Sequence, residues 1–464
     1  MNFQWNTLKI SEILGLGHLG ASQKILEITT DSRSAKPGSV FIAIKGDSLD
    51  GHSFIPQAIS QGATAIISEH PGTNPNGSFF QVPSTLDAIR KLAHTYRKAF
   101  SIPMIAVVGA VGKTTTKELL GSLLQGKYTH VMKTEGSQNG FLGIPITLLQ
   151  LKPETEIAII EIGIDEIGAM DQHLALVEPT HAILTKNGPE HLHQLKTVEI
   201  AAEEELKAYD YSLQHQIPIA LNLSDVFVSQ WVKRHSSKIS KTISKSYSLS
   251  STDQPEYLGT YSSQKHELSV KGPGIEATFQ CPLPGEHHAH NLLAAITLSQ
   301  FFKLSVDEIM TGLQTFKTAY GRTEVYQLPR QIRVIGDYYN SNPTSLDAAL
   351  KLLTSEKGAP AYHAALGDML ELGENEEQFH RSMAQSIMKL GVTHVWLYGP
   401  RMKWLDSELR MKGFQNSAHF ESHDELTQSM RSSLQPGAQV LIKGSRGMKM
   451  EKVLKALLHE GEQN

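Results

Sequence analysis

The chain has 464 residues, of which 40% are hydrophobic and 19% are charged, and its formal net charge is −4. This length predicts two to four domains, because a single hydrophobic core rarely serves more than about 250–300 residues. The charge provides no overall attraction to nucleic acid or to an anionic membrane. The single cysteine, Cys281, excludes an internal disulfide and predicts a reducing, cytoplasmic setting. We expect no secretory signal at the N-terminus and no membrane insertion, because no apolar run approaches about 20 residues.

The N-terminal region alternates short apolar runs with Gly, Pro and Asp. A buried strand is predicted over 39–44 (SVFIAI), and a helix, a turn and a strand over 54–69. A helix over about 85–100 then leads to the next apolar strand. We therefore expect a small α/β domain over residues 1–98.

Two further α/β domains are predicted, over residues 99–315 and 316–464. In the first, apolar strands such as PMIAVVG, EIAIIEIG and THAILT alternate with helical segments, a pattern typical of a mainly parallel sheet covered on both faces. Its Ser-, Thr- and Gln-rich segment 236–279 is expected to form strands and surface loops. In the second, four buried-strand patterns end in polar or glycine-rich residues, and ligand groups gather at such strand ends.

The segment VVGAVGKTTTKE (107–118) follows an apolar strand and opens a helical pattern. A valine stands where the strict Walker A motif requires its first glycine, but the shorter Gly109-x-x-Gly112-Lys113-Thr114 is present. Glycines let backbone N–H groups approach an anion, and the lysine supplies a mobile positive charge. The threonine hydroxyl is expected to face Mg²⁺. A glycine-rich turn with a surface lysine is the alternative, and the order of strand, loop and helix favours a phosphate loop (residues 109–114).

Two more candidates follow strands of the same predicted sheet. Glu161 ends the strand EIAIIE, where a nucleotide enzyme needs a carboxylate for Mg²⁺, although a helix-capping or surface Glu is the alternative. His191 follows the strand HAILT, and its position alone distinguishes it among 21 histidines. It is a candidate metal ligand, and a surface or packed histidine is the alternative reading.

These segments, in this order, resemble the ATP-dependent Mur ligases, which add amino acids or peptides to the cell-wall precursor. The matching central segments are 109–118 (GAVGKTTTKE), 138–149 (QNGFLGIPITLL), 161–163 (EIG), 178–192 (EPTHAILTKNGPEHL) and 285–295 (GEHHAHNLLAA). The matching later segments are 321–322 (GR), 336–350 (GDYYNSNPTSLDAAL), 366–374 (LGDMLELGE) with His380, and 441–451 (LIKGSRGMKME). The N-terminal segment 30–54 resembles the uridine-nucleotide-binding domain of the members that add the third residue or the terminal dipeptide.

The resemblance implies three α/β domains: a small uridine-nucleotide-binding domain, a central P-loop-type parallel-sheet ATPase domain and a C-terminal Rossmann-like domain. It implies an ATP- and Mg²⁺-dependent ligase that adds D-alanyl-D-alanine to UDP-N-acetylmuramoyl-tripeptide through an acyl phosphate, in the cytoplasm and by default as a monomer. Two alternatives stay open. One is another amide ligase of the superfamily, adding a single amino acid or adding glutamates to folate. The other is a non-catalytic nucleotide-binding paralogue.

The resemblance also assigns roles to individual residues. The expected catalytic residues are Lys113, Glu161 and His191, and the expected metal ligands are Thr114, Glu161 and His191. The expected nucleotide-binding residues are Gly109, Gly112, Lys113, Thr114, Thr115, Asn291, Arg322, Asp337, Tyr339 and Asn340. The expected substrate-binding residues are Ser32, Arg33, Asn139, Lys443, Ser445 and Arg446. Dividing a site among domains implies closure, which excludes water from an acyl phosphate.

One departure from the family pattern concerns a carboxylate. The family usually carries a carbamylated lysine in an IAxAKxE segment, where it helps to hold a second metal ion. Here Glu204 takes the place of that lysine. A glutamate supplies the charge but not the reach, so a bridging water, Glu203 or Glu205 are alternatives, as is a solvated acidic helix face.

Other departures lie near the predicted nucleotide and metal. His288 replaces an asparagine expected to contact adenine, and an imidazole donates and accepts only through separate nitrogens. Gly336 replaces the first acidic residue of the family's DDxYNANP segment. The family's TNIGxAH segment reads TKNGPEH here, which places Lys186 and Glu190 near the metal region.

Overall fold

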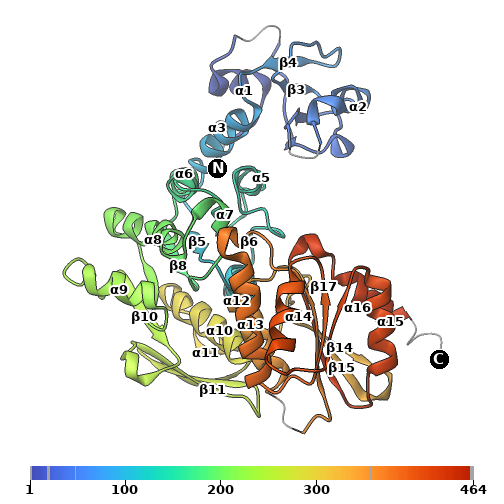
Figure 1. The fold of residues 1–464 in the computed structure, drawn as a ribbon. Helices are drawn as coiled ribbons and strands as arrows, with labels where there is room; N and C mark the ends of the chain where they lie inside the picture. The colour runs from blue at the N-terminus through green and yellow to red at the C-terminus, as the bar shows by residue number, and fades with distance from the viewer. Residues whose placement is uncertain (1–2, 18–20, 47–48, 356–357, 460–464) are drawn as a thin grey trace. The chain divides into compact units, whose positions relative to one another are not determined.

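The chain forms two compact units that share one strand. The computed structural model describes residues 3–17, 21–46, 49–355 and 358–459. The first unit comprises Met1–Ala106, Thr129–Ile162 and Asp171–Thr180, and the second comprises Val107–Tyr128, Gly163–Met170 and His181–Asn464. Strand β5 (Met104–Val108) contributes residues to both units. Within the described residues there are three β-sheets (Figure 1).

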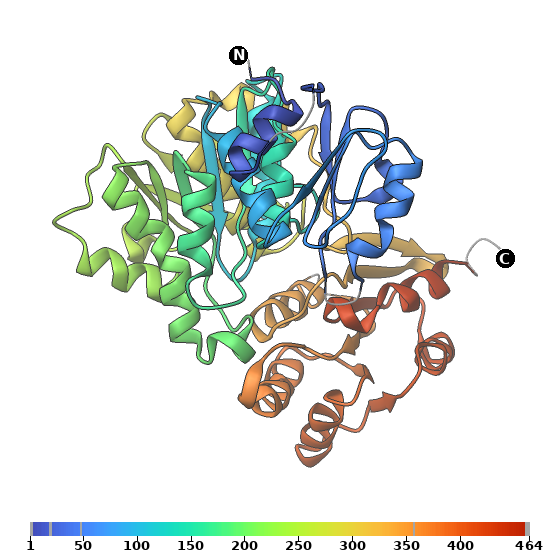
Figure 2. The same ribbon diagram turned by 90° about the horizontal axis from the view of Figure 1, so that it is seen from above.

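The N-terminal sheet is parallel, with the strand order β1-β2-β3-β4 (blue in Figures 1 and 2). Its strands are β1 (Glu27–Thr29), β2 (Ser39–Ile42), β3 (Ala65–Ser68) and β4 (Ser78–Gln81). The helices of this region are α1 (Thr7–Leu14), α2 (Ile55–Ser60) and α3 (Thr85–Arg97). Strands β2 and β3 are buried at every residue, which explains their continuous apolar sequences. The strand predicted over 39–44 and the helix, turn and strand predicted over 54–69 are confirmed.

The second sheet has nine strands in the order β13-β12-β11-β10-β9-β8-β5-β7-β6. Besides β5 they are β6 (Val131–Lys133), β7 (Ile157–Glu161), β8 (His181–Leu184), β9 (Ile219–Asn222), β10 (Ser244–Ser248), β11 (Tyr257–Ser262), β12 (Glu267–Gly272) and β13 (Ile275–Gln280). Strands β8 to β11 pair in parallel, whereas β12 and β13 form an antiparallel extension. The buried strands β5, β7 and β9 contrast with the alternating burial of β12 and β13.

The helices of this central region follow the strands in the expected alternation. They are α4 (Lys113–Gln125), α5 (Gly143–Leu149), α6 (Ala169–Val177), α7 (Leu192–Leu195), α8 (Val198–His215), α9 (Val226–Arg234), α10 (Glu286–Ser299) and α11 (Val306–Leu313). Helix α4 begins directly after β5 and the phosphate loop, and α8 begins after Thr197, whose side chain accepts a hydrogen bond from the Ile200 N–H group. The predicted strand, loop and helix around residues 104–125 are therefore confirmed.

The third sheet has the strand order β14-β15-β19-β16-β17-β18. Its strands are β14 (Glu324–Leu328), β15 (Ile332–Asp337), β16 (Tyr362–Gly367), β17 (His394–Tyr398), β18 (Ser417–Phe420) and β19 (Gln439–Lys443). All pairs are parallel except β14 with β15. Its helices are α12 (Pro343–Leu353), α13 (Glu376–Lys389), α14 (Met402–Met411), α15 (His423–Ser433) and α16 (Glu451–His459).

This third sheet separates two hydrophobic cores. Ile335 and Leu441 pack in the core formed with α12, α13 and α14, whereas Val334 and Val440 pack in the core formed with α15 and α16. Figure 1 shows these two groups of helices on opposite faces of the sheet. The period-2 alternation of strand side chains explains why neighbouring residues enter different cores. The predicted C-terminal α/β sheet is confirmed.

The structure describes no helix that is long and apolar enough to cross a membrane. Each of the three sheets lies inside one of the three predicted domains, and the boundaries near residues 98 and 315 stay a prediction.

Candidate active site

The phosphate loop requires glycine at two positions. Gly109 has φ = 121° and Gly112 has φ = 91°, both in the region that side chains disfavour. A Cβ atom on Gly109 would lie 2.5 Å from Thr185 Oγ1, and one on Gly112 would lie 2.7 Å from Asn291 Oδ1. The structure therefore brings Asn291, predicted to face the nucleotide, directly against the phosphate loop.

Backbone hydrogen bonds fix this loop against the end of β8. The Ala110 and Val111 N–H groups donate to the Lys186 carbonyl at 2.8 and 3.1 Å. The Thr185 hydroxyl donates to the Val111 carbonyl at 2.7 Å. Two segments about 75 residues apart in the sequence thus define the shape of the loop, with Thr114 partly exposed and Thr115 buried at the start of α4.

Lys113 is nearly buried and forms an ion pair with Glu190. Its Nζ lies 3.0 Å from Glu190 Oε2, and the side chains are only 10% and 16% exposed. The ammonium group also donates to the carbonyl of Gly109. The lysine is thus held inside the phosphate loop, and its counter-ion comes from the segment after β8.

The acidic residues of α8 have separate surroundings. Glu204 is buried, and its Oε1 accepts hydrogen bonds from the N–H groups of Gly168 at 2.9 Å and Met170 at 3.0 Å. Its other oxygen pairs with Lys207 at 2.8 Å. Glu203 is exposed. Glu204, which was expected to take the place of the family's lysine, therefore holds the backbone at the start of α6 rather than contacting the phosphate loop.

Glu205 is the α8 glutamate that reaches the phosphate loop. It is buried, and its Oε2 accepts a hydrogen bond from the Gly109 N–H group at 2.7 Å. Burial raises the pKa of Glu205 to about 7, an effect that Lys113 opposes and Glu190 reinforces. Its carboxyl group supports the backbone of the loop from inside the protein.

Glu161 and Asn139, both predicted site residues, lie together in the first unit. Glu161 ends β7, is 1% exposed and accepts a hydrogen bond from Asn139 Nδ2 at 2.8 Å. The Glu161 N–H group donates to Thr134 Oγ1 at 3.0 Å. The amide of Asn139 thus orients a buried carboxylate of the type that binds Mg²⁺.

His191 is held by the carboxylate of Glu371, which lies in the segment after β16. It has φ = 51°, and its Nδ1 lies 2.7 Å from Glu371 Oε2, while its Nε2 lies 3.9 Å from Glu190 Oε1. Burial lowers the pKa of His191, but the hydrogen bond with Glu371 and the charge of Glu190 outweigh it, so the pKa lies above its usual value. The hydrogen bond at Nδ1 leaves Nε2 as the nitrogen that faces Glu190.

Glu371→Gln is expected to move the titration of His191 to lower pH, because it removes the partner charge. In the wild type, the His191–Glu371 pair contributes its full stabilisation of the folded state below pH 6.5, the pKa of the histidine in the unfolded chain. This contribution is lost as the pH rises through the higher pKa of His191 in the folded state. NMR titration of the His191 ring protons measures this shift. Glu374→Gln, at an exposed neighbouring position, is the control and should leave the titration in place. An unchanged His191 titration in Glu371→Gln would contradict the assignment.

The C-terminal ends of β15 and β19 are joined by a buried ion pair. Lys443 Nζ lies 2.6 Å from Asp337 Oδ2 and donates to the Asn340 carbonyl at 2.8 Å. Lys443 is 1% exposed, and burial lowers its pKa while Asp337 opposes that effect. Three of the predicted ligand-facing residues thus form one internal cluster.

A cavity of about 100 Å³ lies beside this cluster. Ser445, at its edge, accepts a hydrogen bond from the Leu370 N–H group at 2.9 Å and donates to the Ser341 carbonyl at 3.2 Å. The cavity is lined by Pro189, Glu190, His191, Asn340, Ser341, Asn342, Leu370, Glu371, Ser445, Arg446 and Gly447. It therefore joins the His191 segment to the strand ends of the third sheet.

Tyr339 lies within cation–π distance of two guanidinium groups. Arg322 Cζ is 4.5 Å and Arg446 Cζ is 5.8 Å from its ring centroid. Arg446 is half exposed and also pairs with Glu451 at 3.2 Å. The positive charges and the aromatic ring offer contacts to an anionic ligand with a planar group.

His288 is turned into the protein. It is 5% exposed, its Nε2 lies 2.8 Å from Thr323 Oγ1, and burial lowers its pKa well below the usual value. The neutral ring therefore joins the start of α10 to the segment after Arg322.

Ser32 and Arg33 lie in the first unit beside the N-terminal sheet. The Ser32 hydroxyl donates to Gln57 Oε1 at 2.9 Å, and the Arg33 guanidinium pairs with Asp31 at 2.7 Å. The Arg33 side chain is 81% exposed. It is therefore accessible to a ligand, whereas Ser32 is held by its neighbour.

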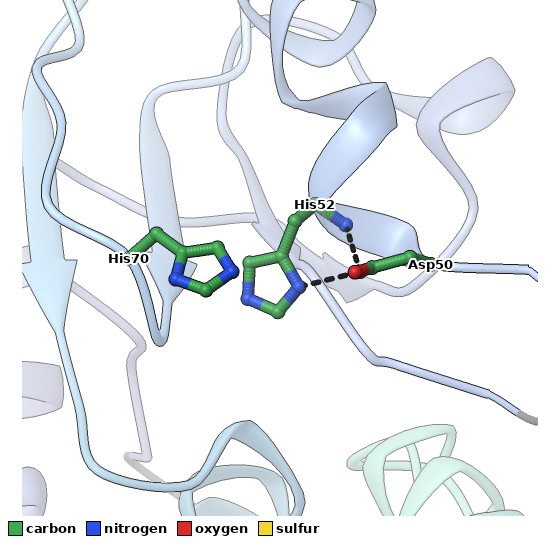
Figure 3. Close-up of side chains that lie close together, drawn as sticks. All are labelled: Asp50, His52 and His70. Carbon is green, nitrogen blue, oxygen red and sulfur yellow. Dashed lines mark hydrogen bonds and ion pairs between the residues drawn. The ribbon is translucent and has the colours of Figure 1, made fainter.

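The N-terminal region also holds Asp50, His52 and His70 close together (Figure 3). His52 Nδ1 lies 2.7 Å from Asp50 Oδ1, and its Nε2 accepts a hydrogen bond from the Glu69 N–H group at 3.1 Å. If a cation bound at Nδ1 of His52, the ring proton would have to sit on Nε2. It would then point at the Glu69 N–H group, which is itself a donor. The hydrogen bonds therefore favour a structural role for this cluster.

The chain is similar to known proteins over nearly its whole length. Residues 24–124, 107–299 and 321–446 match the families described as "Mur ligase family, catalytic domain", "Mur ligase middle domain" and "Mur ligase, glutamate ligase domain". The UDP-N-acetylmuramoyl-tripeptide–D-alanyl-D-alanine ligase of Bacillus subtilis (strain 168) is 32% identical over 93% of both chains. The chain belongs to the Mur ligase family.

Other Mur ligases resemble this one over nearly their full length. The enzyme of the same name from Escherichia coli (strain K12) is 28% identical over 98% of both chains. A crystal structure of MurF from Acinetobacter baumannii has a TM-score of 0.87 and 25% identity, covering 98% of this chain and 99% of its own. The structure of MurF ligase from Thermotoga maritima in complex with ADP shares the fold, with a TM-score of 0.80 and 24% identity. The match covers 94% of this chain and 98% of that chain. The predicted family and the three-domain α/β fold class are confirmed.

Three residues at the site of this Mur ligase were not assigned roles from the sequence. Glu190 pairs with Lys113, Glu371 pairs with His191, and Thr185 fixes the phosphate loop. Glu190 and Glu371 lie inside matching family segments, beside His191 and in LGDMLELGE. Both glutamates lie in segments that follow parallel strands, Glu190 after β8 and Glu371 after β16, and this position was the available signal.

Proposed function

We propose that this Mur ligase is an ATP-dependent enzyme that joins D-alanyl-D-alanine to UDP-N-acetylmuramoyl-tripeptide. The full-length similarity to the B. subtilis ligase of that name, together with a phosphate loop whose Gly112 packs on Asn291, carries the proposal. We propose that the reaction takes place in the cytoplasm and that the enzyme is a monomer with domain boundaries near residues 98 and 315. Light scattering and limited proteolysis test the last two points.

A carboxylate does not condense with an amine in water without activation. In the proposed reaction a carboxylate oxygen of the tripeptide attacks the γ-phosphorus, and ADP leaves. The amine of D-alanyl-D-alanine then attacks the acyl carbon, the C–O bond to phosphate breaks, and the nitrogen loses a proton. Lys113 would hold the γ-phosphate, and its positive charge would stabilise the charge that spreads over the phosphoryl oxygens.

We propose that Mg²⁺ binds at Thr114 and Glu161, with His191 at a second cation. A hydroxyl and a buried carboxylate are oxygen donors of the kind that Mg²⁺ prefers, and Asn139 orients the carboxylate. When bound, Mg²⁺ neutralises phosphate oxygens and orients the γ-phosphate for transfer. Chelation with EDTA should abolish phosphate release, and excess Mg²⁺ should restore it.

The remaining predicted residues are given the roles that the similarity to the Mur ligases implies. We propose that Gly109, Gly112, Lys113, Thr114, Thr115, Asn291, Arg322, Asp337, Tyr339 and Asn340 bind the nucleotide. We propose that Ser32, Arg33, Asn139, Lys443, Ser445 and Arg446 contribute to substrate binding. Because Lys443 is buried with Asp337, it would act by fixing the strand ends that carry the exposed groups.

Phosphate release from ATP with a panel of amines tests the proposal. UDP-N-acetylmuramoyl-tripeptide with D-alanyl-D-alanine should give release and a product of the combined mass minus water. Release with the dipeptide precursor and a single diamino acid would favour another Mur ligase, and release with folate and glutamate a folate ligase. Nucleotide binding with no release from any pair would favour a non-catalytic paralogue.

A further inference from the structure

The second cation of the proposed site needs a carboxylate that α8 does not provide. Glu204 accepts hydrogen bonds from the N–H groups of Gly168 and Met170, and Glu205 accepts one from the Gly109 N–H group. Glu203 is exposed and lines a different hollow, together with Phe227 and Arg234, from the cavity that His191 lines. Each of these hydrogen bonds is buried or partly buried, so turning the carboxylate away would leave N–H groups without an acceptor. The charge beside His191 must come from another segment.

Glu190 lies where that charge is needed. Its Oε2 is 3.0 Å from Lys113 Nζ, and its Oε1 is 3.9 Å from His191 Nε2. The His191 Nδ1 is taken by Glu371, so the nitrogen directed toward Glu190 is the one suited to a cation. One carboxylate therefore contacts the phosphate-loop lysine and faces the candidate metal histidine.

We propose that Glu190 is the carboxylate ligand of the second divalent cation in this enzyme, replacing the carbamylated lysine of its family. The inference rests on the proposed ATP-dependent function. Without nucleotide, Lys113 neutralises Glu190. When Lys113 pairs with the γ-phosphate instead, the Glu190 carboxylate, which is only 16% exposed, loses this ion pair. A cation bound by Glu190 and His191 would then neutralise the carboxylate.

The exchange of partners links nucleotide and cation. Lys113 cannot pair fully with Glu190 and with a phosphate at once. Binding of the triphosphate should therefore raise the affinity for the second cation, and binding of that cation should raise the affinity for the triphosphate. Without divalent ions, Glu190→Gln should bind nucleotide at least as tightly as the wild type, because the competing carboxylate charge is gone. With divalent ions, the same variant should lose the second cation. These opposite effects would not arise from a purely structural role.

Titration of the full chain with Mn²⁺, followed by electron paramagnetic resonance in the presence of β,γ-methylene-ATP, tests the inference. The wild type should bind two Mn²⁺ ions per chain. Glu190→Gln should keep one and bind the second more than about tenfold more weakly. Glu203→Gln, on the exposed face of α8, is the matched control and should keep both. Removing bicarbonate, the source of a lysine carbamate, should leave the wild-type titration unchanged.

Two tightly bound Mn²⁺ ions in Glu190→Gln, or a single one in the wild type, would overturn the inference while leaving the proposed function in place. Loss of the second ion in Glu203→Gln with both kept in Glu190→Gln would also overturn it. Absence of any binding of Mn²⁺ and β,γ-methylene-ATP to the wild type would contradict the proposed function itself. If Glu190→Gln fails to fold by circular dichroism, Glu190→Asp, which keeps the charge on a shorter arm, carries the same test.

Discussion

Replacing Lys113 with alanine is expected to lower ATP-dependent phosphate release about 10³-fold. Its ammonium group is the positive charge at the phosphate loop, and removing one group that stabilises developing negative charge typically costs about 10²–10³ in rate. The loss should appear in kcat as well as in KM, because the charge on the phosphoryl oxygens increases during transfer. Steady-state kinetics with saturating amine and tripeptide measures both.

Lys238→Ala is the matched control for Lys113→Ala. Lys238 is exposed, and its backbone N–H group donates to the His235 carbonyl, a bond that the substitution keeps, so the variant should retain the wild-type rate. Circular dichroism should show that both variants are folded. A Lys113→Ala enzyme that releases phosphate at near the wild-type rate would show that the phosphate loop has been assigned wrongly.

Asp337→Asn is expected to destabilise the third sheet by about 3–5 kcal/mol, because it leaves the ammonium group of Lys443 buried without a counter-ion. The two side chains are 14% and 1% exposed. A chain of several domains does not unfold in one step, so the local effect is best measured by hydrogen exchange in peptides that cover β15 and β19. Exchange there should become faster without any nucleotide present.

The exposed pair Lys271–Glu276 provides the control for this comparison. Its side chains are 74% and 75% exposed, and exposed pairs contribute at most about 1 kcal/mol. Glu276→Gln should therefore change exchange in β12 and β13 only slightly. Equal effects of the two substitutions would contradict the assignment of a buried, stabilising pair between Asp337 and Lys443.

Local patterns were sufficient to predict much of the fold. Strands β2, β5 and β7 are continuous apolar runs because both faces of their sheets are covered, and a buried run of that kind is visible in the sequence. The phosphate loop was recognisable because Gly109 and Gly112 follow a strand and precede a helix, and their positive φ angles explain the need for glycine.

The surroundings of individual acidic residues were not predictable in the same way. Glu203, Glu204 and Glu205 are adjacent and chemically identical, but successive residues point about 100° apart around a helix. Glu203 faces solvent, Glu204 contacts the turn at Gly168, and Glu205 contacts the loop at Gly109. These partners lie 36 and 96 residues away, so tertiary packing decides which glutamate reaches the phosphate loop.

The ion pair between the ends of β15 and β19 could not be predicted from the sequence, for a related reason. Lys443 was expected to face a ligand, and the structure buries it against Asp337, 106 residues earlier in the chain. That contact exists because β15 and β19 are neighbours in the order β14-β15-β19-β16. Strand order depends on how the crossover helices pack, which residue patterns along one strand do not reveal.

In the proposed reaction, ATP activates a carboxyl group of the tripeptide by transferring its γ-phosphate to it. Isotope transfer tests it most directly: the tripeptide substrate is prepared with ¹⁸O in its reacting carboxyl group and incubated with the enzyme, ATP, Mg²⁺ and D-alanyl-D-alanine. Mass spectrometry of the released phosphate should then show one ¹⁸O atom, because the carboxylate oxygen that attacked phosphorus leaves with it. Phosphate free of ¹⁸O, released together with a joined product, would show that the reaction does not pass through an acyl phosphate.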